Sequence, residues 1–146
     1  MKTIKGNDFD MEELKAKADG YIKGGYNCTQ SVIRAIGPEL GMDVDTACRA
    51  TQGFGLGMGD MSEACGAISG GVVVLSYANN ADAETPAGKK DTIQYSKQLV
   101  NGFRDMNTSS TCREIKGVDC DHPMLRSCPG CVEDCVELTV KLLQEM

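Results

Sequence analysis

Residues 53–77, GFGLGMGDMSEACGAISGGVVVLSY, are the stretch that decides the fold of this chain. Its first seven residues contain four glycines, which allow a loop to approach another backbone closely. After Cys65 the sequence is apolar around almost the whole circumference of a helix, which is typical of a helix surrounded by others. The stretch therefore predicts a tight loop followed by a buried, glycine-rich central helix. A buried strand over residues 71–77 is the competing prediction, because periodicity cannot separate the two over so short a run.

The start of this predicted helix combines glycine with cysteine. Gly66 and Gly70 lie one turn apart, and each glycine in a helix costs about 1 kcal/mol relative to alanine. We therefore expect another helix to cross there at short range. Ser62 is the predicted N-cap, which places Cys65 in the first turn, where unpaired N–H groups and the helix dipole stabilise a thiolate. We expect the pKa of Cys65 to be lowered.

The rest of the chain has the caps, glycines and apolar periodicity of further helices. The expected helix starts are Asn7 or Asp8, Asn27, Asp43, the pair Thr85 and Pro86, Thr111, and the pair Cys128 and Pro129. Capping boxes are predicted from Asn27 with Gln30 and from Thr111 with Glu114. Residues 79–88 are expected to form a surface loop. The predicted fold class is all-α, a compact bundle of about five to six helices around the central helix.

Length and charge limit the class of protein. A chain of 146 residues fits one domain, residues 1–146, that is large enough to bury a core. The net charge is −6 and the basic residues are scattered, which argues against nucleic acid and against anionic membrane surfaces as partners. No apolar run reaches transmembrane length. We therefore expect no nucleic-acid partner and no membrane association.

Cysteine usage indicates redox or metal chemistry. The chain has eight cysteines, although its size does not require disulfides, and its first residues lack a signal-peptide pattern. We therefore expect a cytoplasmic protein, a setting in which clustered cysteines more often bind metals or react than form structural disulfides. The apolar central helix is expected to be covered either by helices of the same chain or by a second subunit in a homodimer.

Four cysteines are predicted in the first turn or at the cap of a helix, namely Cys28, Cys65, Cys112 and Cys128. The helix dipole and free N–H donors at such positions stabilise thiolates. The same features suit an anionic iron–sulfur cluster, since N–H groups directed at its sulfurs stabilise it. A single site requires that the four helix starts converge in the folded chain.

The other cysteines support several interpretations. Cys128 and Cys131 form a CPGC motif, and this C-x-x-C spacing serves zinc, iron–sulfur and dithiol sites alike. Cys48 and Cys135 lie on apolar stripes and are interpreted as core thiols. His122, the one histidine, is a candidate fourth ligand of a mixed metal site.

The cysteines and their settings resemble the C_GCAxxG_C_C family of redox-active proteins. The matching features are YNCTQSVIRA around Cys28, GFGLGMG leading into CGAISGG at Cys65, TCREIKG at Cys112, and CPGCVEDCVELTVKLL near the end. The resemblance covers nearly the whole chain. It implies a small helical protein in which Cys28, Cys65, Cys112 and one C-terminal cysteine act together. That last position is Cys128, or Cys131 in its place or in addition.

Three kinds of chemistry are open to these cysteines. The first is an iron–sulfur cluster for electron transfer or redox sensing, with the glycine loop over it and with Cys28, Cys65, Cys112 and Cys128 as ligands. Its partner would be a redox protein or a small-molecule electron donor. The second is a dithiol–disulfide oxidoreductase in which the Cys65 thiolate attacks and Cys28 or a C-terminal cysteine resolves the mixed disulfide. The third is a structural zinc site, with Cys112, Cys120, Cys128 and Cys131 as ligands.

Overall fold

The computed structural model describes residues 9–79, 86 and 88–146, and this part of the chain is all-α, as predicted. The helices are α1 Met11–Lys23, α2 Cys28–Ile36, α3 Val44–Thr51, α4 Gly55–Met58, α5 Gly66–Asn79, α6 Lys89–Asn107, α7 Cys112–Lys116 and α8 Cys128–Glu145. Two 3₁₀ segments, Gly37–Leu40 and Gln52–Phe54, follow α2 and α3. Extended pairing in the described residues is confined to one isolated bridge between Ala64 and Thr111.

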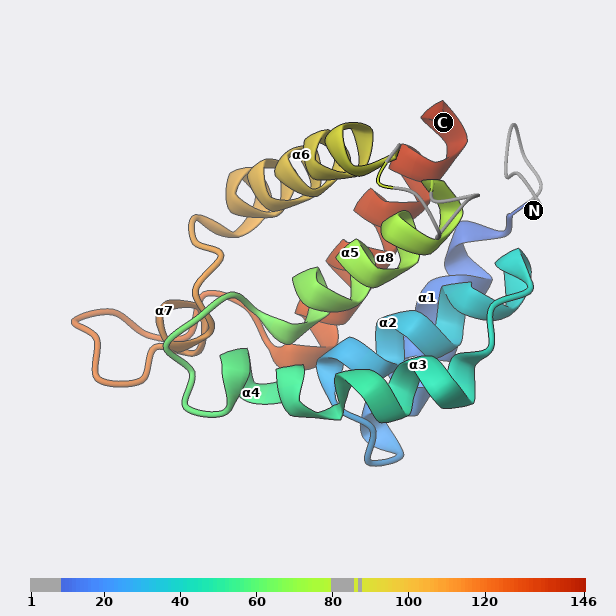
Figure 1. Ribbon diagram of the computed structural model, residues 1–146. Helices are drawn as coiled ribbons and strands as arrows, with labels where there is room; N and C mark the ends of the chain where they lie inside the picture. Colours follow the sequence, from blue (N-terminus) through green and yellow to red (C-terminus); the bar gives the residue numbers. More distant parts are fainter. Residues whose placement is uncertain (1–8, 80–85, 87) are drawn as a thin grey trace.

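The predicted central helix is α5, so the competing strand over residues 71–77 is wrong. α5 packs against α2, α6 and α8, and α1 packs against α2 and α8 (Figure 1). The short helices α4 and α7 lie together at the end of the bundle away from the C-terminus. No helix within the described ranges combines the length and the apolar character needed to cross a membrane.

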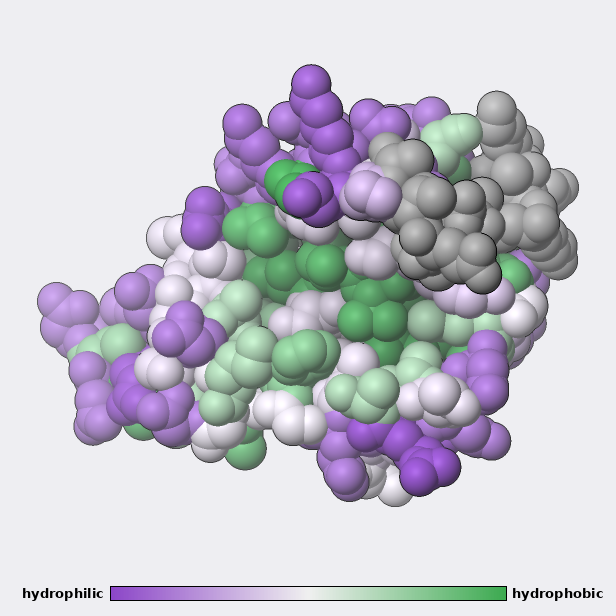
Figure 2. Space-filling view, viewed as in Figure 1, coloured by the Kyte–Doolittle hydropathy of each residue, from purple (hydrophilic) through white to green (hydrophobic). Residues whose placement is uncertain are grey.

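The core is built from the apolar faces of the long helices. Leu75, Leu99 and Phe103 are completely buried, and Cys48 and Cys135 lie in the core as predicted. α5 is not covered all round, because Val72 and Val73 are only half-buried. Figure 2 shows apolar surface gathered in the middle of the same view, between α6 and α3.

Two glycines of α5 allow the close helix crossings that the sequence predicts. A methyl group on Gly70 would lie 2.6 Å from the carbonyl oxygen of Thr29 in α2. A methyl group on Gly71 would lie 2.7 Å from a methyl carbon of Leu99 in α6 and 2.5 Å from the Thr139 hydroxyl in α8. α5 therefore meets its neighbours through backbone, and a side chain at either position would push a helix away.

Polar caps fix most of the helix starts. Asp10 caps α1 through its carboxylate, and the earlier expected caps, Asn7 and Asp8, lie outside the described residues. Asn27 and Gln30 form the predicted capping box of α2, and Asp43 caps α3 as expected. These caps satisfy N–H groups that have no partner within the helix.

The predicted starts of the C-terminal helices need correction. Ser127, not Cys128, caps α8, because its hydroxyl accepts the Gly130 N–H at 3.1 Å, whereas a thiol is a weak acceptor. Thr111 stands at the α7 cap but makes no side-chain cap bond, so the predicted capping box is wrong. Glu114 instead accepts a hydrogen bond from Ser109 at 2.5 Å.

The segment before α6 is only partly described. α6 begins at Lys89, after the Gly88 cap, and not at the expected pair Thr85 and Pro86. Thr85 and most of the expected loop over residues 79–88 lie outside the described residues.

Gly70→Ala should destabilise the protein by about 1–3 kcal/mol, since overpacking against the Thr29 carbonyl outweighs the helix-propensity gain of about 1 kcal/mol. Gly20→Ala in α1 is the matched control, because nothing lies within 4 Å of the added methyl group. The control should stabilise by about 0.5–1 kcal/mol. Urea unfolding followed by circular dichroism measures both, and equal effects of the two substitutions would contradict the close crossing.

Candidate functional site

Backbone pairing between residues 63–65 and 110–112 brings the starts of α5 and α7 together. The Cys65 N–H donates to the Ser110 carbonyl at 2.8 Å, and the Cys112 N–H donates to the Glu63 carbonyl at 2.9 Å. Because residues 63–65 are extended in this pairing, α5 begins at Gly66. Cys65 is thus the residue just before the helix and does not lie within its first turn as predicted. The predicted cap, Ser62, bonds to Asp60 instead.

The start of α2 is held against the start of α5. The Thr29 hydroxyl donates to the Gly66 carbonyl at 2.7 Å, and both residues are buried. A methyl group on Gly66 would lie 3.4 Å from the Cβ atom of Cys28. Cys28 and Cys65, which are 37 positions apart in sequence, therefore stand next to each other.

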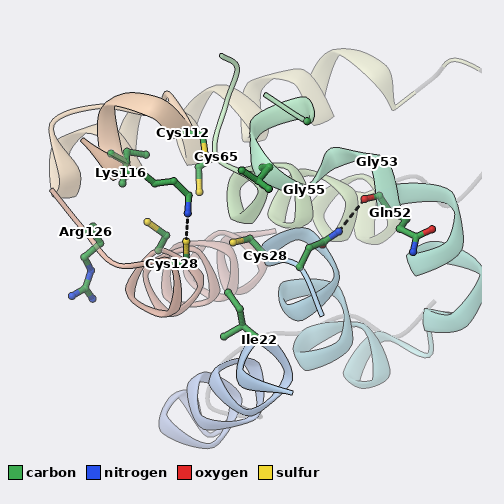
Figure 3. Close-up of a pocket in the computed structure, with 16 residues that line it drawn as sticks. Ile22, Cys28, Gln52, Gly53, Gly55, Cys65, Cys112, Lys116, Arg126 and Cys128 are labelled. Carbon is green, nitrogen blue, oxygen red and sulfur yellow. Dashed lines mark hydrogen bonds between the residues drawn. The ribbon is translucent and has the colours of Figure 1, made fainter. Parts of the chain in front are cut away.

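The helix starts surround one cavity of about 560 Å³ (Figure 3). Five cysteines line it, namely Cys28, Cys65, Cys112, Cys128 and Cys131. These include the four cysteines predicted to ligate a cluster, and Cys131 lines the cavity in addition to Cys128. Cys120, which the sequence predicts as a zinc ligand, does not line it. The glycine loop contributes Gly53, Gly55 and Gly59. A volume of this size lies within the range of small-molecule and cofactor sites.

Gly57 of the loop packs directly on α7. A methyl group there would lie 2.6 Å from the Cβ atom of Cys112, and the residue has a φ of +52°, in the left-handed region that favours glycine. Its neighbours Leu56 and Met58 also have positive φ, at 55° and 67°. Left-handed backbone at such bulky residues is costly and is held only by surrounding contacts, so the loop is fixed against the cavity.

The remaining cysteines and the histidine do not line the cavity. The Cys120 thiol donates to the Val118 carbonyl at 3.3 Å. His122 Nδ1 lies 2.9 Å from the carbonyl oxygen of the adjacent Pro123. Among the described residues, no three His, Cys, Asp or Glu side chains are arranged to hold a single metal ion.

The surroundings of Cys128 stabilise its thiolate form. The Cys28 thiol donates a hydrogen bond to it, and Lys116 Nζ donates a second one at 2.9 Å, so its pKa falls to about 5 although burial opposes the shift. Figure 3 shows Cys28 directed toward Cys128, with Lys116 reaching the Cys128 sulfur from above in this view. The pKa of Cys28 is raised, first by its hydrogen bond to Cys128 and then by burial.

Cys65 and Cys131 form a second pair of the same kind. The Cys131 thiol donates to Cys65 and is the main cause that lowers the pKa of Cys65, with further help from the N–H groups of Ala67 and Ile68. Burial opposes this shift. The predicted lowering is confirmed, but a neighbouring thiol contributes more than the helix start. The pKa of Cys131 is raised by its bond to Cys65 and by burial.

Cys112 is the remaining thiol of the cavity. Its pKa is raised by burial and by the negative charge of Cys65. Cys65 and Cys128 are therefore the two cavity cysteines whose pKa is lowered, and each has a neighbouring thiol whose pKa is raised. Such a site combines nucleophilic sulfur, proton donors and up to five soft ligands.

Sequence reasoning missed the basic residues that line the cavity. Lys116 contacts Cys128, and Arg126 pairs with Asp134, which is buried in α8. The signal for Lys116 was present, because it follows Cys112 by four positions and so lies on the same face of a helix. Arg126 precedes its helix, and no periodicity indicates its position.

Comparison with known proteins gives one match. A family model described as "Putative redox-active protein (C_GCAxxG_C_C)" matches residues 26–142, which include all the cavity cysteines. No curated protein and no solved structure matches the chain.

In the reduced, metal-free protein, the alkylation rate of Cys128 should rise through an inflection near pH 5, the position of its pKa of about 5. Lys116→Met and Cys28→Ala should each move the inflection to higher pH, since each removes a donor that stabilises the thiolate. Lys141→Met, which removes an exposed ammonium elsewhere on α8, should leave it in place.

Iodoacetamide labelling across a pH series, quantified on the Cys128 peptide by mass spectrometry, measures these inflections. A wild-type inflection at the ordinary cysteine pKa of about 8.5 would contradict the assignment of Cys128 as a thiolate.

Proposed function

This chain belongs to the C_GCAxxG_C_C family, and on that premise we propose that it holds an iron–sulfur cluster for electron transfer or redox sensing. The proposed ligands are Cys28, Cys65, Cys112 and Cys128. One observation carries the proposal: these residues come from separate parts of the chain, each stands at the start of a different helix, and all line one cavity.

The chemistry of the donor set supports a cluster. Four cysteine thiolates are the ligands that both common cluster types require. The backbone N–H groups of Ala67 and Ile68 help to lower the pKa of Cys65, and such donors suit an anionic sulfur-rich group. Cys131 is a fifth thiol, which can supplement Cys128. When bound, the cluster would supply one-electron transfer.

The protein's own residues would prepare the site. Cys65 and Cys128 have lowered pKa values and are ready to ligate, while Cys28 and Cys112 have raised ones and must lose protons on binding. Binding should therefore release protons and strengthen with pH. The glycine loop and Ile22 line further parts of the cavity wall.

A dithiol–disulfide oxidoreductase is the second candidate, favoured by the two hydrogen-bonded thiol pairs. The Cys65 thiolate would attack a substrate disulfide, form a mixed disulfide and release one substrate sulfur as a thiol after protonation. The adjacent Cys131, once deprotonated, would attack the Cys65 sulfur and release the second thiol. The products are a Cys65–Cys131 disulfide and two substrate thiols, a two-electron exchange. Cys28 and Cys128 could react in the same way.

The partner of either reaction would be a redox protein or a small-molecule electron donor that reaches the cavity. We retain a homodimer and a cytoplasmic setting as proposals. Zinc remains the alternative metal, with Cys131 beside Cys128 as the C-x-x-C part of its site.

Protein purified without oxygen should contain iron and sulfide in near-equal amounts and absorb broadly in the visible range. Cys28→Ala, Cys65→Ala, Cys112→Ala and Cys128→Ala should each lose most of this iron, because each removes a ligand. Cys120→Ala is the matched control and should retain it, because Cys120 does not line the cavity. Iron, sulfide and zinc assays per chain measure the result.

Iron-free and zinc-free protein that also fails cluster reconstitution would contradict the cluster. In that case the dithiol candidate predicts a Cys65–Cys131 or Cys28–Cys128 disulfide on treatment with oxidised glutathione, detected by peptide mass spectrometry. Zinc at one atom per chain without iron would favour the structural metal site.

A further inference from the structure

One cationic side chain of the cavity faces a sulfur and not a carboxylate. Lys116 and Arg126 are the charged residues that line it in the described part of the chain. Arg126 donates to both carboxylate oxygens of Asp134, at 3.0 and 3.1 Å, so its charge is balanced. No carboxylate among residues 9–79 and 88–146 forms an ion pair with Lys116, whose ammonium instead donates to Cys128 Sγ at 2.9 Å.

The helix that carries Lys116 is held firmly in place. The Arg113 N–H donates to the Met61 carbonyl at 2.8 Å at one end of α7, and the Leu125 N–H donates to the Ile115 carbonyl at 2.8 Å near the other. Ile115, next to Lys116, is buried. The Lys116 side chain therefore reaches Cys128 from a backbone that is held on both sides.

Reduction of a centre in this cavity adds negative charge next to the ammonium. In a cluster the added electron spreads over sulfurs that include the cysteine ligands, and in a disulfide two electrons produce thiolates. Positive charge and N–H donors at sulfur stabilise the reduced state more than the oxidised one. A cluster and a disulfide would therefore both be easier to reduce with the ammonium in place.

We propose that Lys116 is a positioning residue that raises the reduction potential of the cavity's redox centre through its hydrogen bond and charge at the Cys128 sulfur. The inference rests on the proposed function, because it presupposes a redox centre that includes Cys128. It is independent of whether that centre is a cluster or a dithiol.

Lys116→Met tests this at pH 7 by potentiometric titration of protein reconstituted with iron and sulfide. The equilibrium constant for reduction should fall at least tenfold, which is about 59 mV for one electron. Lys116→Arg keeps the charge and donors and should stay near the wild-type potential. Lys141→Met, which removes an exposed ammonium from α8, should also leave it unchanged. Each variant should have the iron content and the circular dichroism spectrum of the wild type, which verifies that it is folded and holds the cluster.

If wild-type protein takes up no cluster, the same variants are compared in dithiothreitol redox buffers, where a tenfold change is about 30 mV for two electrons. If a redox couple can be measured and the wild-type and Lys116→Met proteins have the same reduction potential, the role of Lys116 is overturned. The proposed function would then still stand. If the wild-type protein forms neither a cluster nor a reversible disulfide, the role of Lys116 and the proposed function are both overturned.

Discussion

The close contact between α2 and α5 is the constraint on which the rest of the structure depends. Gly66 and Gly70 present backbone to α2, and the Thr29 hydroxyl donates to the Gly66 carbonyl at 2.7 Å. Cys28 precedes Thr29 and Cys65 precedes Gly66, so the packing that builds the core also sets two sulfurs side by side. A substitution that separated these helices would cost stability and would open the cavity at once.

The other sulfurs reach the cavity by different means. Backbone pairing with residues 63–65 holds Cys112, and the Ser127 cap orients the first turn of α8, which carries Cys128 and Cys131. As a result, Cys65 and Cys128 each have a neighbouring thiol, Cys131 and Cys28 respectively, that lowers their pKa. This arrangement lowers the cost of negative charge in a largely buried site, which any redox chemistry at these sulfurs requires.

The sequence was sufficient to predict the all-α class, the central helix and the set of cysteines, because caps and apolar periodicity are local signals. It could not predict that Cys65 stands before α5, since that depends on pairing with a segment more than forty positions away. Cys131 stayed ambiguous because C-x-x-C spacing does not show which sulfur faces a cavity. Lys116 was visible only as one lysine among scattered charges, and its role depends on the placement of Cys128.

The central claim is that sulfurs from four helix starts act as one redox centre. Isotope-coded alkylation of all eight cysteines, before and after anaerobic addition of iron and sulfide, tests it most directly. We expect Cys28, Cys65, Cys112 and Cys128 to become protected together, while Cys120 keeps its reactivity. Iron uptake that left these four sulfurs as reactive as before, or that protected Cys120 instead, would contradict it.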